Sequence, residues 1–178
     1  MAKQRKKLLI VDGYNVLRSG SRYRQIAGPD YTDDAFNRAR ETLINDVVNY
    51  AGREWRAIIV FDGGRNQFST GEAETVGGVR IMFSPSGSSA DKVIEKLAHD
   101  ARERLVETLV VTSDATIQDT VFGGGVDRMS ADGFSRELAL YEEDARLDDT
   151  PKVAQKNTVA ARLDPATLAK LQAMRDGR

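Results

Sequence analysis

The chain has 178 residues, 40% of them hydrophobic and 30% charged, with a formal net charge of -1. This length fits one domain of ~100 to 200 residues with a short appendage, and the composition supports a folded core rather than a disordered chain. The near-neutral charge argues against a protein that coats nucleic acid by bulk charge. No run approaches the ~18 to 20 apolar residues of a membrane span, and no signal-peptide hydrophobic segment follows the basic N-terminus. We therefore expect a cytoplasmic protein without membrane association.

Few side chains of this sequence are reactive. There is no cysteine, and His99 is the only histidine. Disulfides, thiolate zinc sites and cysteine nucleophiles are thereby excluded, and a Ser-His-Asp triad has little support. The apolar helical pattern around His99 favours a surface or packed histidine over a general base. Any chemistry is expected to depend on carboxylates.

Strands and helices are predicted to alternate along the chain. Near-continuous apolar runs at 8–11, 57–61 and 108–112 are typical of strands buried on both faces of a parallel sheet. Residues 79–83 alternate more, which favours a position nearer an edge, and a short fifth strand is expected at 126–129. Helical spacing of apolar residues predicts helices at 36–50, 93–105, 115–121 and 131–141. The fold class is therefore α/β, with an open parallel sheet flanked by helices.

The two ends of the chain differ in character from its middle. Residues 1–6 form a basic extension, and the domain is expected to span 7–146. An acidic, proline-punctuated stretch then leads into a C-terminal extension, 147–178. Within it, Asp164 followed by Pro165 predicts the start of a terminal helix, because aspartate favours the N-cap and proline the first helical position.

Four aspartates fall where the predicted strands end or the next helix begins. Asp12, Asp62 and Asp114 follow strands, and Asp91 opens a helix. Because the carboxyl ends of parallel strands share one edge of a sheet, these side chains are expected to converge. Clustered carboxylates repel one another unless a cation neutralises them, and oxygen ligands suit Mg²⁺ or Mn²⁺.

Each aspartate also has a purely structural interpretation. Asp91 fits a capping box with Ser88, and Asp114 can cap the helix that follows it. Asp62 is as readily a turn residue as an accessory metal ligand. Capping gives no reason for Asp12, Asp91 and Asp114 to share one edge, so a joint site is favoured for these three.

Polar residues near the aspartates are further candidates. Asn15 is either a site residue or a loop amide that satisfies backbone groups. Ser113 and Gln118 flank Asp114 and are candidates to orient it or to contact a phosphate.

The N-terminal end of the chain is locally basic, which indicates either a solubilising tail or a contact surface for a polyanion. Residues 1–24 hold seven basic side chains and one acid, a local charge of +6. A loop is expected after Asp12, and its arginines are candidates for phosphate contacts: Arg18, Arg22 and Arg24. Tyr14 and Tyr23 are candidates for stacking on a base.

Four ordered motifs carry a family resemblance. They are Leu-Leu-Ile-Val-Asp-Gly-Tyr-Asn-Val at 8–16, Val-Phe-Asp-Gly at 60–63, Ser-Ala-Asp-Lys-Val-Ile-Glu at 89–95 and Val-Thr-Ser-Asp at 111–114. Together they resemble the NYN-domain, PIN-like ribonucleases, most closely the bacterial YacP-like branch. The likeness covers about residues 7–140, and 156–178 is similar to that branch's C-terminal extension.

The resemblance implies a Mg²⁺- or Mn²⁺-dependent nuclease site that cleaves single-stranded RNA, with endonucleolytic action and the ribosome as a possible partner. Asp12, Asp91 and Asp114 match the family's acidic metal-site residues, and Asn15 matches its asparagine. Asp62 matches a less uniform position and is carried over only as an accessory acid.

Two other functions stay open. A haloacid-dehalogenase-like phosphatase also places an aspartate after its first strand, but it needs a second one two residues on, where this chain has Tyr14. A non-catalytic module that binds RNA or the ribosome would need no intact site.

Overall fold

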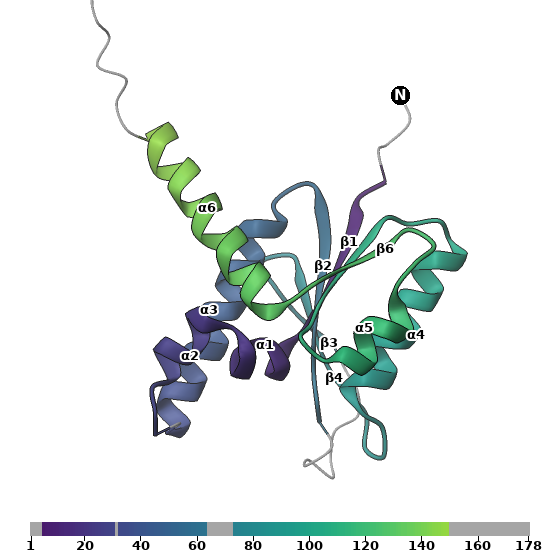
Figure 1. Ribbon diagram of the computed structural model, residues 1–178, viewed down its shortest axis with the longest axis horizontal. Helices are drawn as coiled ribbons and strands as arrows, with labels where there is room; N and C mark the ends of the chain where they lie inside the picture. Colours follow the sequence, from purple (N-terminus) through teal and green to yellow (C-terminus); the bar gives the residue numbers. More distant parts are fainter. Residues whose placement is uncertain (1–4, 31, 64–72, 150–178) are drawn as a thin grey trace, which may run out of the picture. The chain divides into compact units, whose positions relative to one another are not determined.

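The computed structural model describes residues 5–30, 32–63 and 73–149 (Figure 1). The chain forms two compact units, Met1–Glu142 and Glu143–Arg178. The sheet and its core belong to the first of them. The predicted terminal helix lies outside the described residues.

A six-stranded sheet forms the centre of the first unit, in the order β3-β4-β2-β1-β5-β6. All neighbouring pairs are parallel except β3 and β4. The strands are β1 (Lys7–Asp12), β2 (Trp55–Phe61), β3 (Ala73–Val76), β4 (Val79–Phe83), β5 (Thr108–Val111) and β6 (Val126–Met129). The five predicted strands are confirmed. The antiparallel edge strand β3 was not predicted, because it is short and mostly exposed and has no apolar run.

Helices cover both faces of the sheet, with α1, α2, α3 and α6 on one side and α4 and α5 on the other (Figure 1). Their bounds are α1 (Gly13–Ser19), α2 (Ser21–Ala27), α3 (Asp33–Ala51), α4 (Ala90–Glu103), α5 (Ala115–Val121) and α6 (Ala131–Asp149). The expectation of a loop after Asp12 is wrong, since α1 and α2 begin there. The helix predicted at 131–141 is confirmed, and as α6 it continues to Asp149, into the acidic stretch.

Strand β1 is buried on both faces from Leu8 to Asp12 and separates two apolar clusters. Leu9 and Val11 pack against the side of α1, α2, α3 and α6, whereas Leu8 and Ile10 pack under α4 and α5. Each of these side chains is at most 2% exposed, and full burial of such a side chain contributes about 1.5 to 3 kcal/mol. The two-sided burial explains why the sequence of β1 does not alternate.

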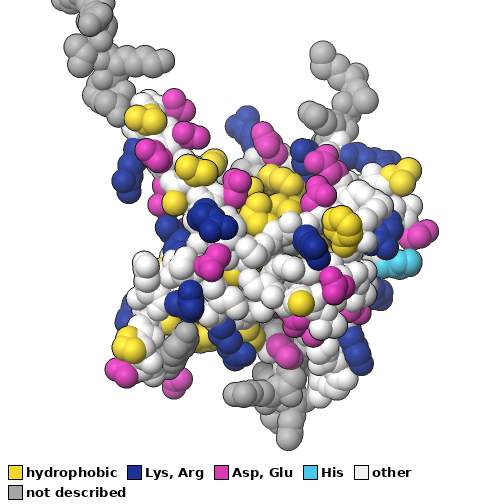
Figure 2. Space-filling view, in the orientation of Figure 1, with side chains coloured by type: hydrophobic (Ala, Val, Ile, Leu, Met, Phe, Trp, Pro, Cys, Tyr) yellow, Lys and Arg dark blue, Asp and Glu magenta, His cyan; other side chains and the backbone are white. Residues whose placement is uncertain are grey.

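On the face shown in Figure 2, acidic and basic side chains are interspersed, in keeping with the near-neutral charge of the chain. His99 is exposed, as expected for a histidine outside any site. No helix in the described ranges is long and apolar enough to cross a membrane.

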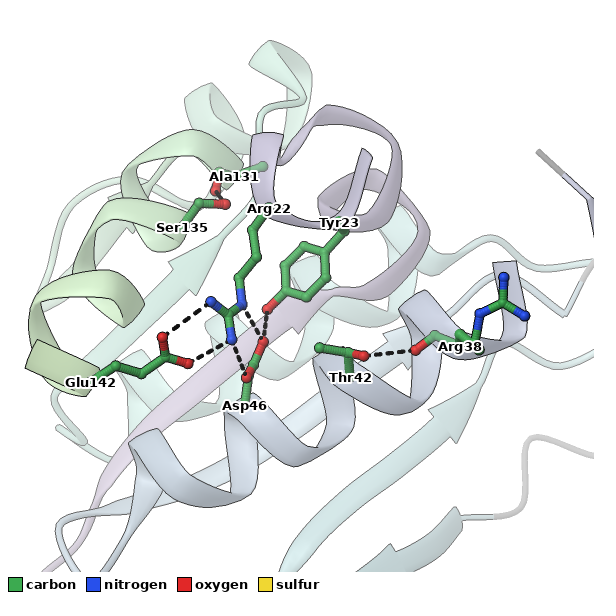
Figure 3. A network of polar contacts seen from close by, with 8 residues as sticks. All are labelled: Arg22, Tyr23, Arg38, Thr42, Asp46, Ala131, Ser135 and Glu142. Atoms are coloured by element: carbon green, nitrogen blue, oxygen red, sulfur yellow. Dashed lines mark hydrogen bonds and ion pairs between the residues drawn. The ribbon is translucent and has the colours of Figure 1, made fainter. Parts of the chain in front are cut away.

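Arg22 and Tyr23 belong to a polar network that joins α2, α3 and α6 (Figure 3). The Arg22 guanidinium donates to both oxygens of Asp46, at 2.9 and 3.1 Å, and to Oε1 of Glu142 at 2.6 Å. The Tyr23 hydroxyl donates to Oδ2 of Asp46 at 2.8 Å, and the ring is fully buried. Burial and then the Asp46 carboxylate raise the pKa of Tyr23, so the hydroxyl keeps the proton that it donates. The expectations of a phosphate contact for Arg22 and of base stacking for Tyr23 are therefore wrong.

Replacing Tyr23 with phenylalanine is expected to lower the free energy of unfolding by about 1 to 2 kcal/mol, because a buried hydrogen bond to a charged group is lost while the packing of the ring is kept. Urea denaturation measures the difference. Thr42→Ala on α3 is the control, since the Thr42 hydroxyl makes only an exposed bond to the Arg38 carbonyl. Equal decreases in the free energy of unfolding of the two variants would contradict a stabilising role for the network.

Candidate active site

The carboxyl ends of β2, β1 and β5 lie side by side and form one wall of a cavity. The chain leaves β1 toward β2 on one side and returns to β5 on the other, and such a reversal of strand order is where open α/β sheets bind ligands. The cavity has a volume of about 730 Å³. Its lining includes all four predicted aspartates: Asp12, Asp62, Asp91 and Asp114.

Asp12 is the buried acid of the cavity. It ends β1, is 6% exposed, and its Oδ2 accepts a hydrogen bond from the Thr112 hydroxyl at 2.9 Å. Burial raises the pKa of Asp12 to about 6, the Thr112 hydrogen bond opposes that rise, and the charges of Asp91 and Asp114 add to it. A carboxyl group perturbed in this way within a cavity is typical of a functional site.

Gly13 allows α1 to begin directly after Asp12. A Cβ at this position would lie 2.3 Å from Cε1 of Phe61, which is fully buried at the end of β2. Because the ring has no room to move aside, the close approach of α1 to β2 requires glycine. The Asp-Gly pair of the first motif is thus set by packing as well as by chemistry.

Asp91 lies in the first turn of α4 and is half-buried. The N-cap is Ser89, whose hydroxyl accepts from the Lys92 amide at 3.4 Å, so the capping box between Ser88 and Asp91 is wrong. Burial raises the pKa of Asp91, and the largest further contribution comes from the charge of Asp114. The two acids therefore repel each other across the cavity.

Asp114 has both of the roles considered for it. Its Oδ1 accepts from the Thr116 amide at 2.9 Å and caps α5, and the side chain also lines the cavity. The backbone amide of Asp114 donates to the Thr112 hydroxyl at 3.1 Å. Thr112 therefore connects Asp12 to Asp114. Sequence reasoning missed it, although a hydroxyl residue at the end of a buried strand was a usable signal.

Asp62 lies at the exposed rim of the cavity, where β2 ends. The Ser84 hydroxyl donates to Oδ1 of Asp62 at 3.1 Å and accepts from the Gly63 amide at 2.9 Å. Ser84 is fully buried and orients Asp62 from the neighbouring strand end. Sequence reasoning missed this residue too, although it follows β4 directly.

Asn15, Ser113 and Gln118 fix the backbone around the acids. Oδ1 of Asn15 accepts from the Ser113 amide at 2.7 Å, which joins α1 to the segment before α5. The Ser113 hydroxyl accepts from the Ala131 amide at 2.9 Å, and the Gln118 amide donates to the Thr112 carbonyl at 2.6 Å. Of the three, Asn15 alone is among the described residues that line the cavity.

An aromatic wall and one arginine complete the cavity. The Tyr14 ring packs on Phe61 and Phe36, with centroids 4.9 and 5.7 Å apart. The Arg18 guanidinium lies 5.8 Å from the Tyr14 ring centroid and is exposed. Arg24, also exposed, lies on α2 and is not among the lining residues described.

The donor chemistry of the cavity suits a hard divalent cation. Carboxylate oxygens are the ligands that Mg²⁺ and Mn²⁺ prefer, and the mutual repulsion of Asp12, Asp91 and Asp114 is the kind of charge that a cation offsets. Within the ranges that the structure describes, no group of three or more acidic or histidine side chains is placed to hold a metal ion directly. Mg²⁺ keeps several waters and takes as few as one or two carboxylates, so the residues fit the ion in type and in number.

This fold is that of the NYN-domain class, whose members are nuclease-like. The chain belongs to the YacP-like NYN domain family, whose model matches residues 9–176. The resemblance drawn from the four motifs is thereby confirmed.

Relatives in Bacillus subtilis support the assignment. The chain is 32% identical over 136 residues to the uncharacterized protein YacP of strain 168, which is 76% of each protein. It also superposes on two crystal structures of Rae1 (YacP) from that species. For a mutant form the TM-score is 0.64 at 28% identity, covering 94% of this chain and 99% of that one. For the other the TM-score is 0.63 at 27% identity, covering 96% and 95%.

Proposed function

We propose that the protein is a Mg²⁺- or Mn²⁺-dependent endoribonuclease that hydrolyses phosphodiester bonds of single-stranded RNA. The observation that carries the proposal is the meeting of four aspartates, from three neighbouring strand ends and the start of α4, in one cavity of about 730 Å³. Membership of a nuclease-like family supports it. The proposal extends to RNA as partner, to association with the ribosome and to the cytoplasm as compartment.

We assign metal binding to the acidic side chains of the cavity. Asp12, Asp91 and Asp114 would hold the ion, one or two of them directly and the others through its bound waters, with Asp62 as an accessory acid at the rim. When bound, the ion supplies an activated water and offsets the negative charge that builds on the phosphodiester. The Thr112 hydroxyl favours the ionised form of Asp12, because its hydrogen bond opposes the effect of burial on the pKa.

We assign substrate binding to other residues that line the cavity. Tyr14 offers an aromatic face for a base, and Arg18 offers a guanidinium for a phosphate. Asn15 holds α1 against the segment that carries Asp114, so the two halves of the cavity keep their spacing.

Arg18→Ala is expected to weaken binding of a single-stranded RNA and to reduce the slope of log K against log salt by about 0.7, the value for one phosphate contact on a single strand. Fluorescence anisotropy in EDTA measures both without cleavage. Arg24→Ala removes the same charge outside the cavity and serves as the control. Equal effects of the two substitutions would show that Arg18 contributes only general charge.

The function is tested by incubating the protein with an unstructured RNA, and separately with a phosphomonoester, in Mg²⁺, Mn²⁺ or EDTA. We expect RNA fragments with 5′-phosphate ends in either metal, and none in EDTA. Phosphomonoester turnover without RNA cleavage would support a haloacid-dehalogenase-like phosphatase instead. Binding of RNA without any cleavage would support a non-catalytic module.

The packing around Tyr14 disfavours the phosphatase. Such an enzyme needs a second carboxylate two residues after its first aspartate. Here that position holds Tyr14, whose ring packs on Phe36 and Phe61. Helix α1 contains no aspartate or glutamate that could take the place of this second carboxylate.

A further inference from the structure

A second cavity, of about 360 Å³, lies near the amino ends of β1, β2 and β4, on the side of the sheet that α4 covers. Leu8 near the start of β1 lines it, whereas Asp12 at the end of the same strand lines the catalytic cavity. Four residues of extended strand span about 13 Å. The two cavities are therefore separate but close enough for one extended polymer to reach both.

Strand register gathers two arginines at the second cavity. Arg56 pairs with Leu8 of β1, and Arg80 pairs with Ile58 of β2. Arg56 has the same parity along β2 as Ile58, which packs under α4, so Arg56 and Arg80 lie on the same face of the sheet. Gly78 lines the cavity beside Arg80 and leaves it open, because a Cβ built there meets no atom within 4 Å.

Helix α4 supplies the opposite wall. Leu97, Ala101 and Arg104 follow helical spacing and line the cavity together with Asp100. Arg104 is the C-cap of α4, where its charge compensates the negative end of the helix dipole. Asp100 is the one acid among the described lining residues, against three arginines, so the lining keeps a net positive charge. Arg56 and Arg80 are the cations left for a ligand.

Both arginines are exposed, and within the described ranges neither forms an ion pair with a carboxylate. This distinguishes them from Arg22, which is fully engaged inside the protein. Between the guanidiniums the floor of the cavity is apolar, formed by Leu8, Ile58 and Leu97. The site therefore combines two free cations with a small apolar pocket.

We propose that this cavity is a second RNA-binding site, which holds one nucleotide of the substrate with its phosphate on Arg56 and Arg80 and its base on the apolar floor. The inference rests on the proposed function for the identity of the polymer. Arginine recognises phosphate through paired hydrogen bonds, and the apolar floor favours a nucleotide over a bare phosphate. Helix α4 begins at the catalytic cavity and ends at this one, and its 14 residues span about 21 Å. RNA following this helix would contact both sites.

The test measures RNA affinity of the full chain in EDTA by fluorescence anisotropy as salt is varied. Arg56→Gln combined with Arg80→Gln is expected to raise Kd about tenfold and to reduce the slope of log K against log salt by about 0.7, the value for one phosphate of a single strand. Arg38→Gln combined with Arg53→Gln removes two exposed charges away from both cavities and is the matched control. An unchanged Kd in the first double variant, or an equal change in the control, would overturn the proposal.

A competition arm tests the nucleotide itself. Uridine 5′-monophosphate should displace RNA from the unchanged protein more effectively than inorganic phosphate does, and the Arg56/Arg80 variant should lose this difference. Equal displacement by the two probes would overturn the role of the apolar floor. RNA cleavage is scored separately: binding that depends on Arg56 and Arg80 without cleavage would refute the endoribonuclease and leave this site standing. Cleavage with unaltered affinity in the double variant would refute this site alone.

Discussion

Asp91→Asn is expected to reduce RNA cleavage by about a thousandfold, which corresponds to about 4 kcal/mol of lost transition-state stabilisation. Asparagine keeps the size of the side chain but removes the charge that the proposed cation requires. The fold should survive, because Ser89 rather than Asp91 caps α4. Loss of an acid from the first turn of a helix costs only about 0.3 to 1 kcal/mol. Initial rates of cleavage and a thermal melt of each protein measure the two quantities.

The control for this substitution is Asp127→Asn, which removes one exposed acid from β6, outside both cavities. It should cleave RNA at the rate of the unchanged protein. If Asp91→Asn and the unchanged protein cleave alike, the cleavage arises at another site or in a contaminant, and the assignment of the acidic cavity fails.

Asp12→Asn is expected to abolish cleavage and, in EDTA, to stabilise the fold at pH 8 by up to about 3 kcal/mol. The pKa of Asp12 is raised by burial to about 6 in the folded protein, against about 3.9 in an unfolded chain. The folded state therefore holds this proton more tightly. The resulting stability is present in full below about pH 4 and is lost as the pH rises through about 6. Asparagine is neutral at every pH, so the variant does not lose this stability as the pH rises.

Urea denaturation at pH 4 and pH 8 measures this difference between the two proteins. The advantage of Asp12→Asn should be present at pH 8 and small at pH 4. Mg²⁺ or Mn²⁺ should raise the melting temperature of the unchanged protein more than that of the variant, because a ligand stabilises the state that binds it. A variant less stable than the unchanged protein at pH 8 would contradict the burial of a charged Asp12.

The sequence was informative where one physical signal dominated. The uninterrupted apolar run of β1 predicted a strand buried on both faces, and helical spacing predicted a helix at 93–105, where α4 lies. The predicted apolar face was one residue off, since Ile94 and Ala98 are buried whereas Leu105 is 87% exposed. Parallel strands place their carboxyl ends together, so aspartates following β1, β2 and β5 could be assigned to one edge before any coordinates were known. The structure brings Asp12, Asp62 and Asp114 to one cavity there.

Other features depend on partners far away in the chain. Arg22 resembled a phosphate ligand because nothing nearby in sequence neutralises it, yet its partners Asp46 and Glu142 lie 24 and 120 residues away. Helices α1 and α2 are only seven residues long, too short for a clear period, and they form because tertiary packing buries one side of each. The hydroxyl partners of the acids, Thr112 and Ser84, could not be assigned without knowing which strand ends are neighbours.

The hydrogen bond between Thr112 and Asp12 spans 100 residues of sequence. During synthesis from the N-terminus, Asp12 is therefore made long before the strand that supplies its hydrogen-bond donor and the loop that carries Asp114. A nascent chain that ends before β5 has no closed cavity, whatever its other elements have formed, because β5 is one of the two neighbours of β1. The acidic cavity is therefore completed only after β5 and the segment that carries Asp114 have been synthesised, and an incomplete polypeptide released early would carry Asp12, Asp62 and Asp91 without their arrangement.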